Sequence, residues 1–194
     1  MFFVLALATT AGVVLLCTQC PEIGIALSKE SRDFHRLKNR TTLPQTSDFD
    51  NSFALGKVLE RGDDTDRWST SRAGTLDGYV VTIGNASVEL ANCYVPCSRD
   101  IHVNVALRPD APAREQIVLE VTPRMRNWAS RQGLDWSEKT LRRELLGRFV
   151  HFEGWLLFDW THAKEAENTS PGNPTNWRAT AWEIHPVTSF KIIR

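Results

Sequence analysis

Hydrophobic and polar residues alternate in short stretches over the last two thirds of the chain, a pattern typical of strands with one buried face. The alternation is strictest in residues 100–107 (DIHVNVAL), and it recurs in 116–122 (QIVLEVT) and 176–187 (NWRATAWEIHPV). Residues 78–83 (GYVVTI) and 148–159 (RFVHFEGWLLFD) are rich in β-branched and aromatic residues. The pattern therefore predicts five strands.

The stretch 176–187 has two faces of clearly different character. Trp182 and Ile184 fall on one side, which we expect to be the core side, and Glu183 and His185 fall on the other. Pro186 has no amide hydrogen, so the regular ladder is predicted to end there or to become an edge. The strand would then have one buried face and one outward face whose Glu and His side chains could bind a metal or transfer protons.

Two helices are predicted between the third and fourth strands. Thr122 followed by Pro123 is typical of a helix start, and Gly133 of a helix end. Asp135 with Glu138 three residues later has the spacing of a capping box for a second helix. In the strand that follows, Gly154 marks the expected position of a bulge.

The order of three strands, a helical segment and two strands is the connectivity of an OB-type barrel. We therefore expect residues 73–194 to form a mainly β domain, an OB-like five-stranded barrel with a helical insertion. A small sandwich is the alternative. Residues 21–72 are polar, with short helices expected at 31–38 and 53–59, and they are predicted to be an N-terminal arm that packs on the barrel.

Residues 1–20 begin with an uncharged apolar run, FFVLALATTAGVVLLC at positions 2–17. The run is shorter than the roughly 20 residues of a comfortable membrane-spanning helix and close to the core of a signal peptide. No lysine or arginine precedes it, and no small-x-small cleavage motif follows. The segment is predicted to be a signal peptide or membrane anchor of an exported protein, and the only part in contact with a membrane. A buried or mis-started N-terminus is the alternative.

The four cysteines are Cys17, Cys20, Cys93 and Cys97. If the leader were removed after Cys20, only Cys93 and Cys97 would remain, and in an exported protein a local disulfide between them is favoured. Free thiols are the second alternative. A zinc site that also uses His102 is the third, although no fourth ligand lies at close spacing.

Several motifs together resemble a family of uncharacterised bacterial proteins: FHRLKNR at 34–40, EVTPR at 120–124, GWLLFD at 154–159, ENT at 167–169 and the segment 176–188. Members of that family are usually exported and sometimes described as OB-like. The resemblance covers roughly residues 31–190 and implies the fold and export, but no activity. The family has a tighter Cys-x-Cys where this chain has Cys93 and Cys97, so a shared role of these cysteines does not carry over.

The outward positions of three predicted strands hold groups that bind metals. His102, Glu120 and His185 would come from the second, third and fifth strands, which are neighbours in an OB barrel. Two imidazoles and a carboxylate are suitable ligands for a divalent metal such as zinc, and they could equally form a general acid/base pair. The alternative is that they are polar residues scattered over a solvated barrel face.

A candidate ligand-binding surface lies beside them. Trp177 and Arg178 are predicted to form an exposed stacking pair where a loop meets the last strand, with Glu183 next to them. His151 is expected to be a surface histidine, and His162 lies in a polar loop.

Charge limits the functional classes. Lysine plus arginine and aspartate plus glutamate each number 23, so the chain lacks the basic excess of most nucleic-acid-binding domains. The leading hypothesis is an exported binding or interaction module of unknown ligand. A metal-dependent enzyme, such as a hydrolase using His102, Glu120 and His185, is the second. Single-stranded nucleic-acid binding is the third, which the fold permits and the charge disfavours.

Overall fold

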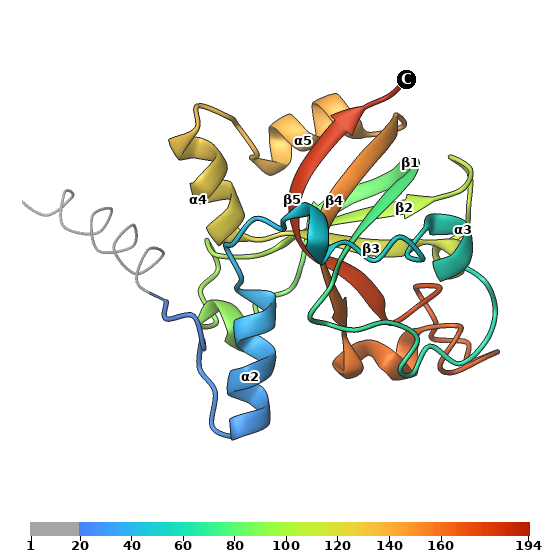
Figure 1. The fold of residues 1–194 in the computed structure, drawn as a ribbon, viewed down its shortest axis with the longest axis horizontal. Coiled ribbons are helices and arrows are strands. Elements are labelled where there is room, and N and C mark those ends of the chain that lie inside the picture. Colours follow the sequence, from blue (N-terminus) through green and yellow to red (C-terminus); the bar gives the residue numbers. More distant parts are fainter. Residues whose placement is uncertain (1–19) are drawn as a thin grey trace, which may run out of the picture.

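Five strands close into a barrel in the order β1-β2-β3-β5-β4 in the computed structural model, which describes residues 20–194 (Figure 1). All neighbouring strands are antiparallel except β3 and β5, which are parallel. The predicted OB-like barrel with a helical insertion is confirmed. The strands are β1 (Ala73–Asn85), β2 (Ile101–Ala106), β3 (Ile117–Val121), β4 (Phe149–Phe158) and β5 (Trp182–Ile192).

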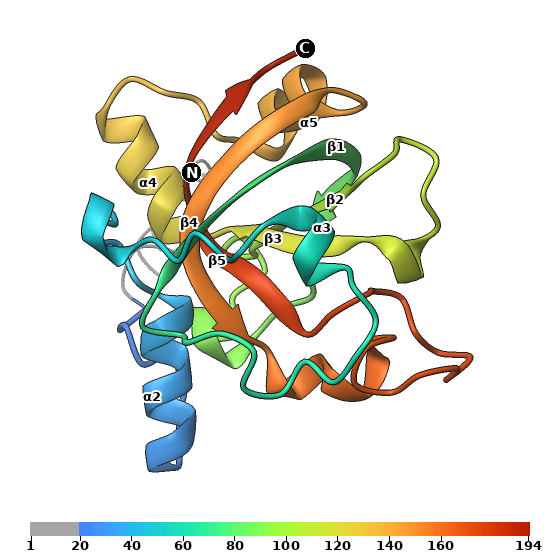
Figure 2. The same ribbon diagram turned by 45° about the vertical axis from the view of Figure 1, so that its right-hand side comes forward.

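The longer helices lie at opposite sides of the barrel. Figures 1 and 2 show α4 and α5 near the C-terminus, and α2 projecting from the other side. Among residues 20–194, no helix combines the length and apolar character that a membrane crossing requires. The helices are α2 (Lys29–Lys38), α3 (Leu55–Val58), α4 (Pro123–Arg131) and α5 (Glu138–Leu145).

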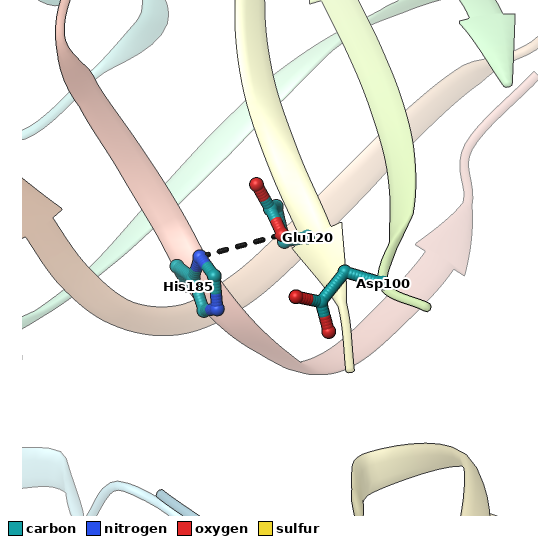
Figure 3. Close-up of side chains that lie close together, drawn as sticks. All are labelled: Asp100, Glu120 and His185. Atoms are coloured by element: carbon teal, nitrogen blue, oxygen red, sulfur yellow. Dashed lines mark ion pairs between the residues drawn. The ribbon is translucent and has the colours of Figure 1, made fainter. Parts of the chain in front are cut away.

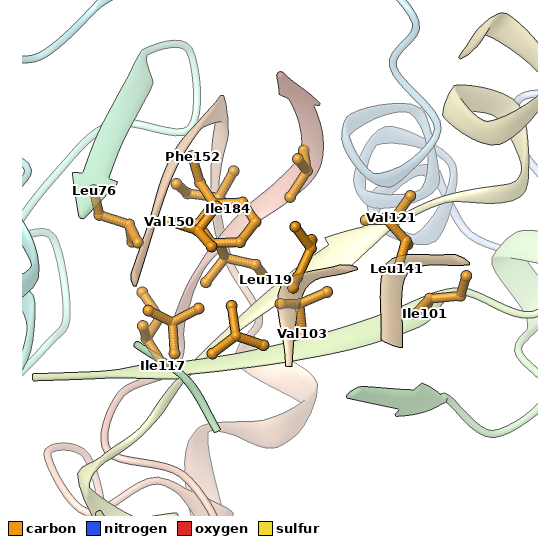
Figure 4. Close-up of a cluster of buried hydrophobic side chains, with 14 of the residues drawn as sticks. Leu76, Ile101, Val103, Ile117, Leu119, Val121, Leu141, Val150, Phe152 and Ile184 are labelled. Atoms are coloured by element: carbon orange, nitrogen blue, oxygen red, sulfur yellow. The ribbon is translucent and has the colours of Figure 1, made fainter. Parts of the chain in front are cut away.

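The core fills the barrel and continues under α4 and α5. The inward residues of β2 and β3 are fully buried, as their alternation predicts, and Leu141 of α5 closes one end (Figure 4). Trp182 is 1% exposed and stacks edge-on against Trp68 at 5.6 Å between ring centroids. Its indole Nε1 donates to the backbone oxygen of Asp64 at 2.8 Å, so its one polar atom is satisfied.

The helix starts follow the expected chemistry with one correction. Thr122 caps α4 by accepting a hydrogen bond from the backbone of Met125, and Pro123 occupies the first turn. The cap of α5 is Ser137, not Asp135. The Asp135 carboxylate instead accepts from the backbone N–H of Ser137 and from Thr140, so it supports the start of α5 from outside it.

Residues in the range 20–72 contact the barrel at several points. Arg40 donates to the backbone oxygens of Thr70, Leu156 and His185, and so connects the arm to β4 and β5. A short bridge between Phe49 and Ala73 leads the chain into β1. The expected helices at 31–38 and 53–59 correspond to α2 and the shorter α3.

The predicted disulfide between Cys93 and Cys97 is wrong, because Cys93 pairs with Cys20, with a Cα–Cα distance of 5.7 Å. Zinc binding by Cys93 is excluded by the same bond, and Cys97 is not free. A pairing across 73 residues had no local sequence signal. The predicted leader segment, residues 1–20, lies outside the described residues apart from Cys20.

The structure corrects the course of the last strand at both ends. Residues 176–181 are not part of β5, which begins at Trp182 and continues through Pro186 to Ile192. Past Pro186 it still pairs with β4, because a register shift at Gly154 accommodates the irregular backbone. Pairing with β3 stops at Ile184, so the strand is bounded by β4 alone beyond that point. The predicted bulge at Gly154 is confirmed.

Two further strands differ in length from expectation. β1 (Ala73–Asn85) extends beyond the predicted stretch 78–83 at both ends. β2 (Ile101–Ala106) is shorter than the predicted stretch 100–107, and Leu107, just after it, is 60% exposed.

Replacing Trp182 with Ala should lower the free energy of unfolding by about 3–5 kcal/mol, because the indole fills the barrel end next to Trp68. Denaturant unfolding measures this change. The exposed Trp160 is the matched control, and Trp160→Ala should cost less than about 1 kcal/mol. Equal losses in the two variants would contradict the placement of Trp182.

Gly154→Ala should destabilise the barrel by about 1–3 kcal/mol, because a Cβ at this position would overlap the carbonyl oxygen of Pro186 and the side chain of Ile184. Gly84→Ala, where an added Cβ would meet only Arg142 Nη2 at 4.0 Å, should change stability by less than about 1 kcal/mol. Chemical denaturation of both variants tests the close approach of β4 to β5, and an unaffected Gly154→Ala protein would refute it.

Candidate functional site

The outer face of β2, β3 and β5 carries the polar residues that the alternation places there, but this face is buried. Glu120 is 1% exposed, and Glu183 and His185 are fully buried. The expectation of a solvated barrel face is therefore wrong. The physical reason is coverage: Lys38 of α2 lies over this face and forms an ion pair with Glu89 of the β1–β2 connection.

Glu120 lies at the centre of the cluster. It sits opposite His102 in the β2–β3 register, and His102 Nε2 is 3.1 Å from Glu120 Oε1. His185 Nδ1 is 3.6 Å from the other oxygen, Glu120 Oε2. The three residues predicted as metal ligands are thus neighbours, but the two imidazoles lie at opposite oxygens of the carboxylate.

Asp100 completes a different group of three. Asp100, Glu120 and His185 each offer one possible ligand atom, and these atoms lie within 4.8 Å of one another. Figure 3 shows the Asp100 carboxylate facing the His185 ring, with Glu120 beside both. Asp100 lies two residues before His102, and residues two apart in an extended strand point to the same face. This spacing could have identified Asp100 as a member of the group from the sequence.

The two acidic groups of the trio have displaced pKa values. Burial and the neighbouring Glu120 charge raise the pKa of Asp100 to about 7. Burial opposes the ionised form of Glu120 too, but the charges of His185, His102 and Lys38 outweigh it and hold its pKa well below the usual range. Glu120 is therefore ionised at neutral pH.

The basic groups respond to these carboxylates. Burial disfavours the protonated form of His102, but Glu120 more than offsets it and raises the pKa to about 9. For His185, Glu120 and Glu183 likewise raise the pKa against burial. Lys38 is also buried, and four surrounding carboxylates, Glu120 foremost, raise its pKa above the ordinary lysine value.

Arg178 belongs to this interior. It is fully buried, its Nε donates to the backbone oxygen of Thr180 at 2.7 Å, and its Nη2 lies 2.7 Å from Glu183 Oε1. The angles of the Arg178–Glu183 contact do not form a hydrogen bond, so the pair is held by charge. Arg178 and Glu183 are consequently not available to an external ligand.

Trp177 is also occupied within the protein. The His102 ring stacks on it at 6.1 Å with planes 10° apart, the guanidinium of Arg178 lies 5.1 Å from its centroid, and its Nε1 donates to Glu165 at 2.6 Å. The predicted exposed stacking pair of Trp177 and Arg178 is therefore wrong. An aromatic residue next to an arginine gave no indication that Arg178 would be buried and Trp177 half-buried against His102.

The remaining histidines form separate carboxylate pairs. His162 Nδ1 is 2.9 Å from Asp159 Oδ2, and its ring lies edge-on to Trp177. Asp159 is fully buried; burial opposes its ionisation, but His162 and Lys38 lower its pKa. His151 is a surface histidine, as predicted, and contacts Asp77 at 2.5 Å and Glu153 at 3.3 Å.

A groove lies between the arm and the barrel, close to this cluster. Its volume is about 510 Å³, and its walls combine aromatic rings, hydroxyl groups and two carboxylates. Trp160, in the β4–β5 connection, is 57% exposed there and contacts the Phe34 ring at 5.4 Å. The groove is lined by Asp33, Phe34, Leu37, Thr65, Asp66, Trp68, Ser69, Thr70, Phe158, Trp160 and Trp182.

Comparison of the chain with models of protein families finds no match, and a search of curated proteins finds none either. The assignment of function accordingly depends on the geometry of the site and the groove.

The pairing of His162 with Asp159 should appear directly in its titration. The Asp159 side chain raises the pKa of His162 above the usual value of about 6.5, although burial opposes this. An NMR titration should therefore give a midpoint above about 6.5, which Asp159→Asn lowers. Because the folded pKa is raised, the pair's stabilisation of about 0.2–1 kcal/mol is complete below pH 6.5 and is lost as pH rises through the folded pKa. A midpoint unaffected by Asp159→Asn would contradict the pairing.

Proposed function

We propose that the protein is an exported binding module that recognises a neutral saccharide in the groove between α2 and the barrel. The observation that carries this proposal is the exposed Trp160 ring at the groove, with Phe34 packed beside it. An aromatic ring exposed in a concave groove can stack on a ligand, and ligand pockets are commonly lined by such rings. OB-type barrels use the connection between the fourth and fifth strands for ligands, and Trp160 lies in that connection.

The groove chemistry suits a sugar. Aromatic rings supply apolar area to the C–H faces of a pyranose, and hydroxyl and carboxylate groups can accept and donate hydrogen bonds at its edges. Aromatic rings and hydrogen-bonding groups both line the groove. The hydrogen-bonding groups include the side chains of Thr65, Ser69, Asp33 and Asp66. Asp33 is ionised, since hydrogen bonding from Lys29 lowers its pKa, so it acts as an acceptor.

The same lining disfavours nucleic acid. No lysine or arginine is among the described residues that line the groove, whereas two aspartates are. Phosphates bind where cations neutralise them, and carboxylates repel them. Together with the net charge of +0, this makes single-stranded nucleic acid a weaker candidate than a neutral saccharide.

A hydrolase is supported less well than a binding module. Catalytic metal sites keep a position open for water and substrate. Asp100, Glu120 and His185 are at most 1% exposed, and the half-buried His102 lies on their outer side. The carboxylates and the imidazole that could bind a catalytic metal are thus enclosed. The open groove instead has a lining suited to binding a ligand.

Export is supported by the Cys20–Cys93 disulfide, since such bonds persist in oxidising compartments. The apolar run at residues 2–17 supports it independently. Saccharides on the outside of cells are ligands that an exported module can meet.

Trp160→Ala should weaken saccharide binding about fivefold or more, because a stacked aromatic face contributes about 1–3 kcal/mol. Trp160→Phe should retain most of the affinity, since it keeps an aromatic face. A panel of neutral oligosaccharides, followed by titration with the best binder, provides the measurement.

Leu107→Ala is the control, because Leu107 is 60% exposed and is not among the groove residues. It should leave the affinity unchanged. The proposal fails if no neutral saccharide binds, or if binding is equal in the parent and Trp160→Ala proteins. Salt-sensitive binding of single-stranded oligonucleotides in their place would favour the nucleic-acid alternative.

A further inference from the structure

Three buried residues on the outer face of the barrel share an unusual arrangement of partners. Asp100, Glu120 and His185 each have one polar atom held by a neighbouring side chain and one buried polar atom without any hydrogen-bond partner. The unpaired atoms are Asp100 Oδ1, Glu120 Oε2 and His185 Nε2. Buried polar groups are nearly always satisfied, so three such atoms on three neighbouring residues need an explanation.

The partnered atoms show how the three side chains are fixed. Asp100 Oδ2 accepts a hydrogen bond from Asn92 Nδ2 at 3.0 Å. Glu120 Oε1 is held by His102 Nε2 at 3.1 Å. Each carboxylate is thereby oriented by a residue outside the trio, and its second oxygen is left unpaired.

His185 follows the same rule. Its Nδ1 lies 3.1 Å from Glu183 Oε2, close enough to donate to it, whereas Glu120 Oε2 at 3.6 Å is too far for a hydrogen bond. A ring that donates from Nδ1 to a carboxylate presents a lone pair at Nε2. This is the arrangement in which metal-binding histidines are held by a second carboxylate.

The charges around the trio are compatible with a bound cation. Lys38 pairs with Glu89, and Arg178 pairs with Glu183. The charges of Asp100 and Glu120 then remain to be balanced inside the protein, where an uncompensated charge is costly. A divalent cation balances both. Protonation of His102 and His185 is the alternative, and the two alternatives can be separated by experiment.

We propose that Asp100, Glu120 and His185 bind a divalent transition-metal ion such as zinc, with Asn92, His102 and Glu183 orienting the three ligands. One nitrogen and two carboxylate oxygens are a suitable ligand set for zinc. Zinc–ligand distances are about 2.0–2.2 Å, so the three residues, whose possible ligand atoms lie within 4.8 Å of one another, must move closer together around the ion. Because the site is enclosed, the ion has a structural role: it joins β2, β3 and β5 beneath the arm. This proposal is independent of the saccharide proposal.

The test is a zinc titration of the purified full chain with its disulfide intact, after removal of metals with a chelator. In competition with a chromogenic chelator, the parent protein should bind one equivalent of zinc. Asp100→Asn and Glu120→Gln, which keep the side-chain shape, should each weaken binding at least tenfold, and Asn92→Ala about tenfold by releasing Asp100. Zinc should raise the melting temperature of the parent and not that of Asp100→Asn.

His151→Ala is the matched control, because His151 with Asp77 and Glu153 is a surface histidine–carboxylate group outside the site. It should leave stoichiometry and affinity unchanged. The proposal is overturned if the parent binds no zinc and its melting temperature does not respond. It is also overturned if His151→Ala removes the bound zinc, or if the folded Asp100→Asn and Glu120→Gln proteins bind zinc as the parent does. If those variants do not fold, the parent titration and its melting temperature decide.

Discussion

The ion pair between Lys38 and Glu89 is the constraint on which the covering of the barrel depends. It brings an ammonium from α2 and a carboxylate from the β1–β2 connection to 2.5 Å, over a face that already contains Glu120, Glu183 and His185. Removing charges from water costs several kcal/mol per ion unless each finds a partner. The arm can therefore close only where its lysine meets these carboxylates, and this requirement fixes the position of α2.

The other arm contacts follow from that position. Arg40, two residues beyond Lys38, donates hydrogen bonds to backbone oxygens of β4 and β5. If its side chain moved away, these contacts would be lost. The Cys20–Cys93 disulfide joins the start of the arm to the same β1–β2 connection that supplies Glu89. Covalent and ionic links thus hold one small region together, and the barrel face beneath it is shielded from solvent.

The barrel could be predicted because it depends on local patterns. The alternation of apolar and polar residues predicted β2 and β3. The start of α4 was predicted from Thr122 and the bulge in β4 from Gly154. The site was predicted only in part. The side of the sheet occupied by His102, Glu120 and His185 followed from the two-residue period, but their burial depends on a segment far away in sequence. Asp100 was included in the alternating stretch 100–107, but its carboxylate was not considered as a metal ligand.

The errors at Trp177 and Arg178 have the same origin. Periodicity distinguishes the two faces of a strand, but it cannot tell whether a second layer covers the outer one. Here α2 forms part of that layer, and its residues face two ways: Lys38 lies over the charged cluster, while Phe34 lines the groove with Trp160. One short helix therefore closes the enclosed site and forms a wall of the open groove. The charges that position α2 also determine the shape of the surface available to a ligand.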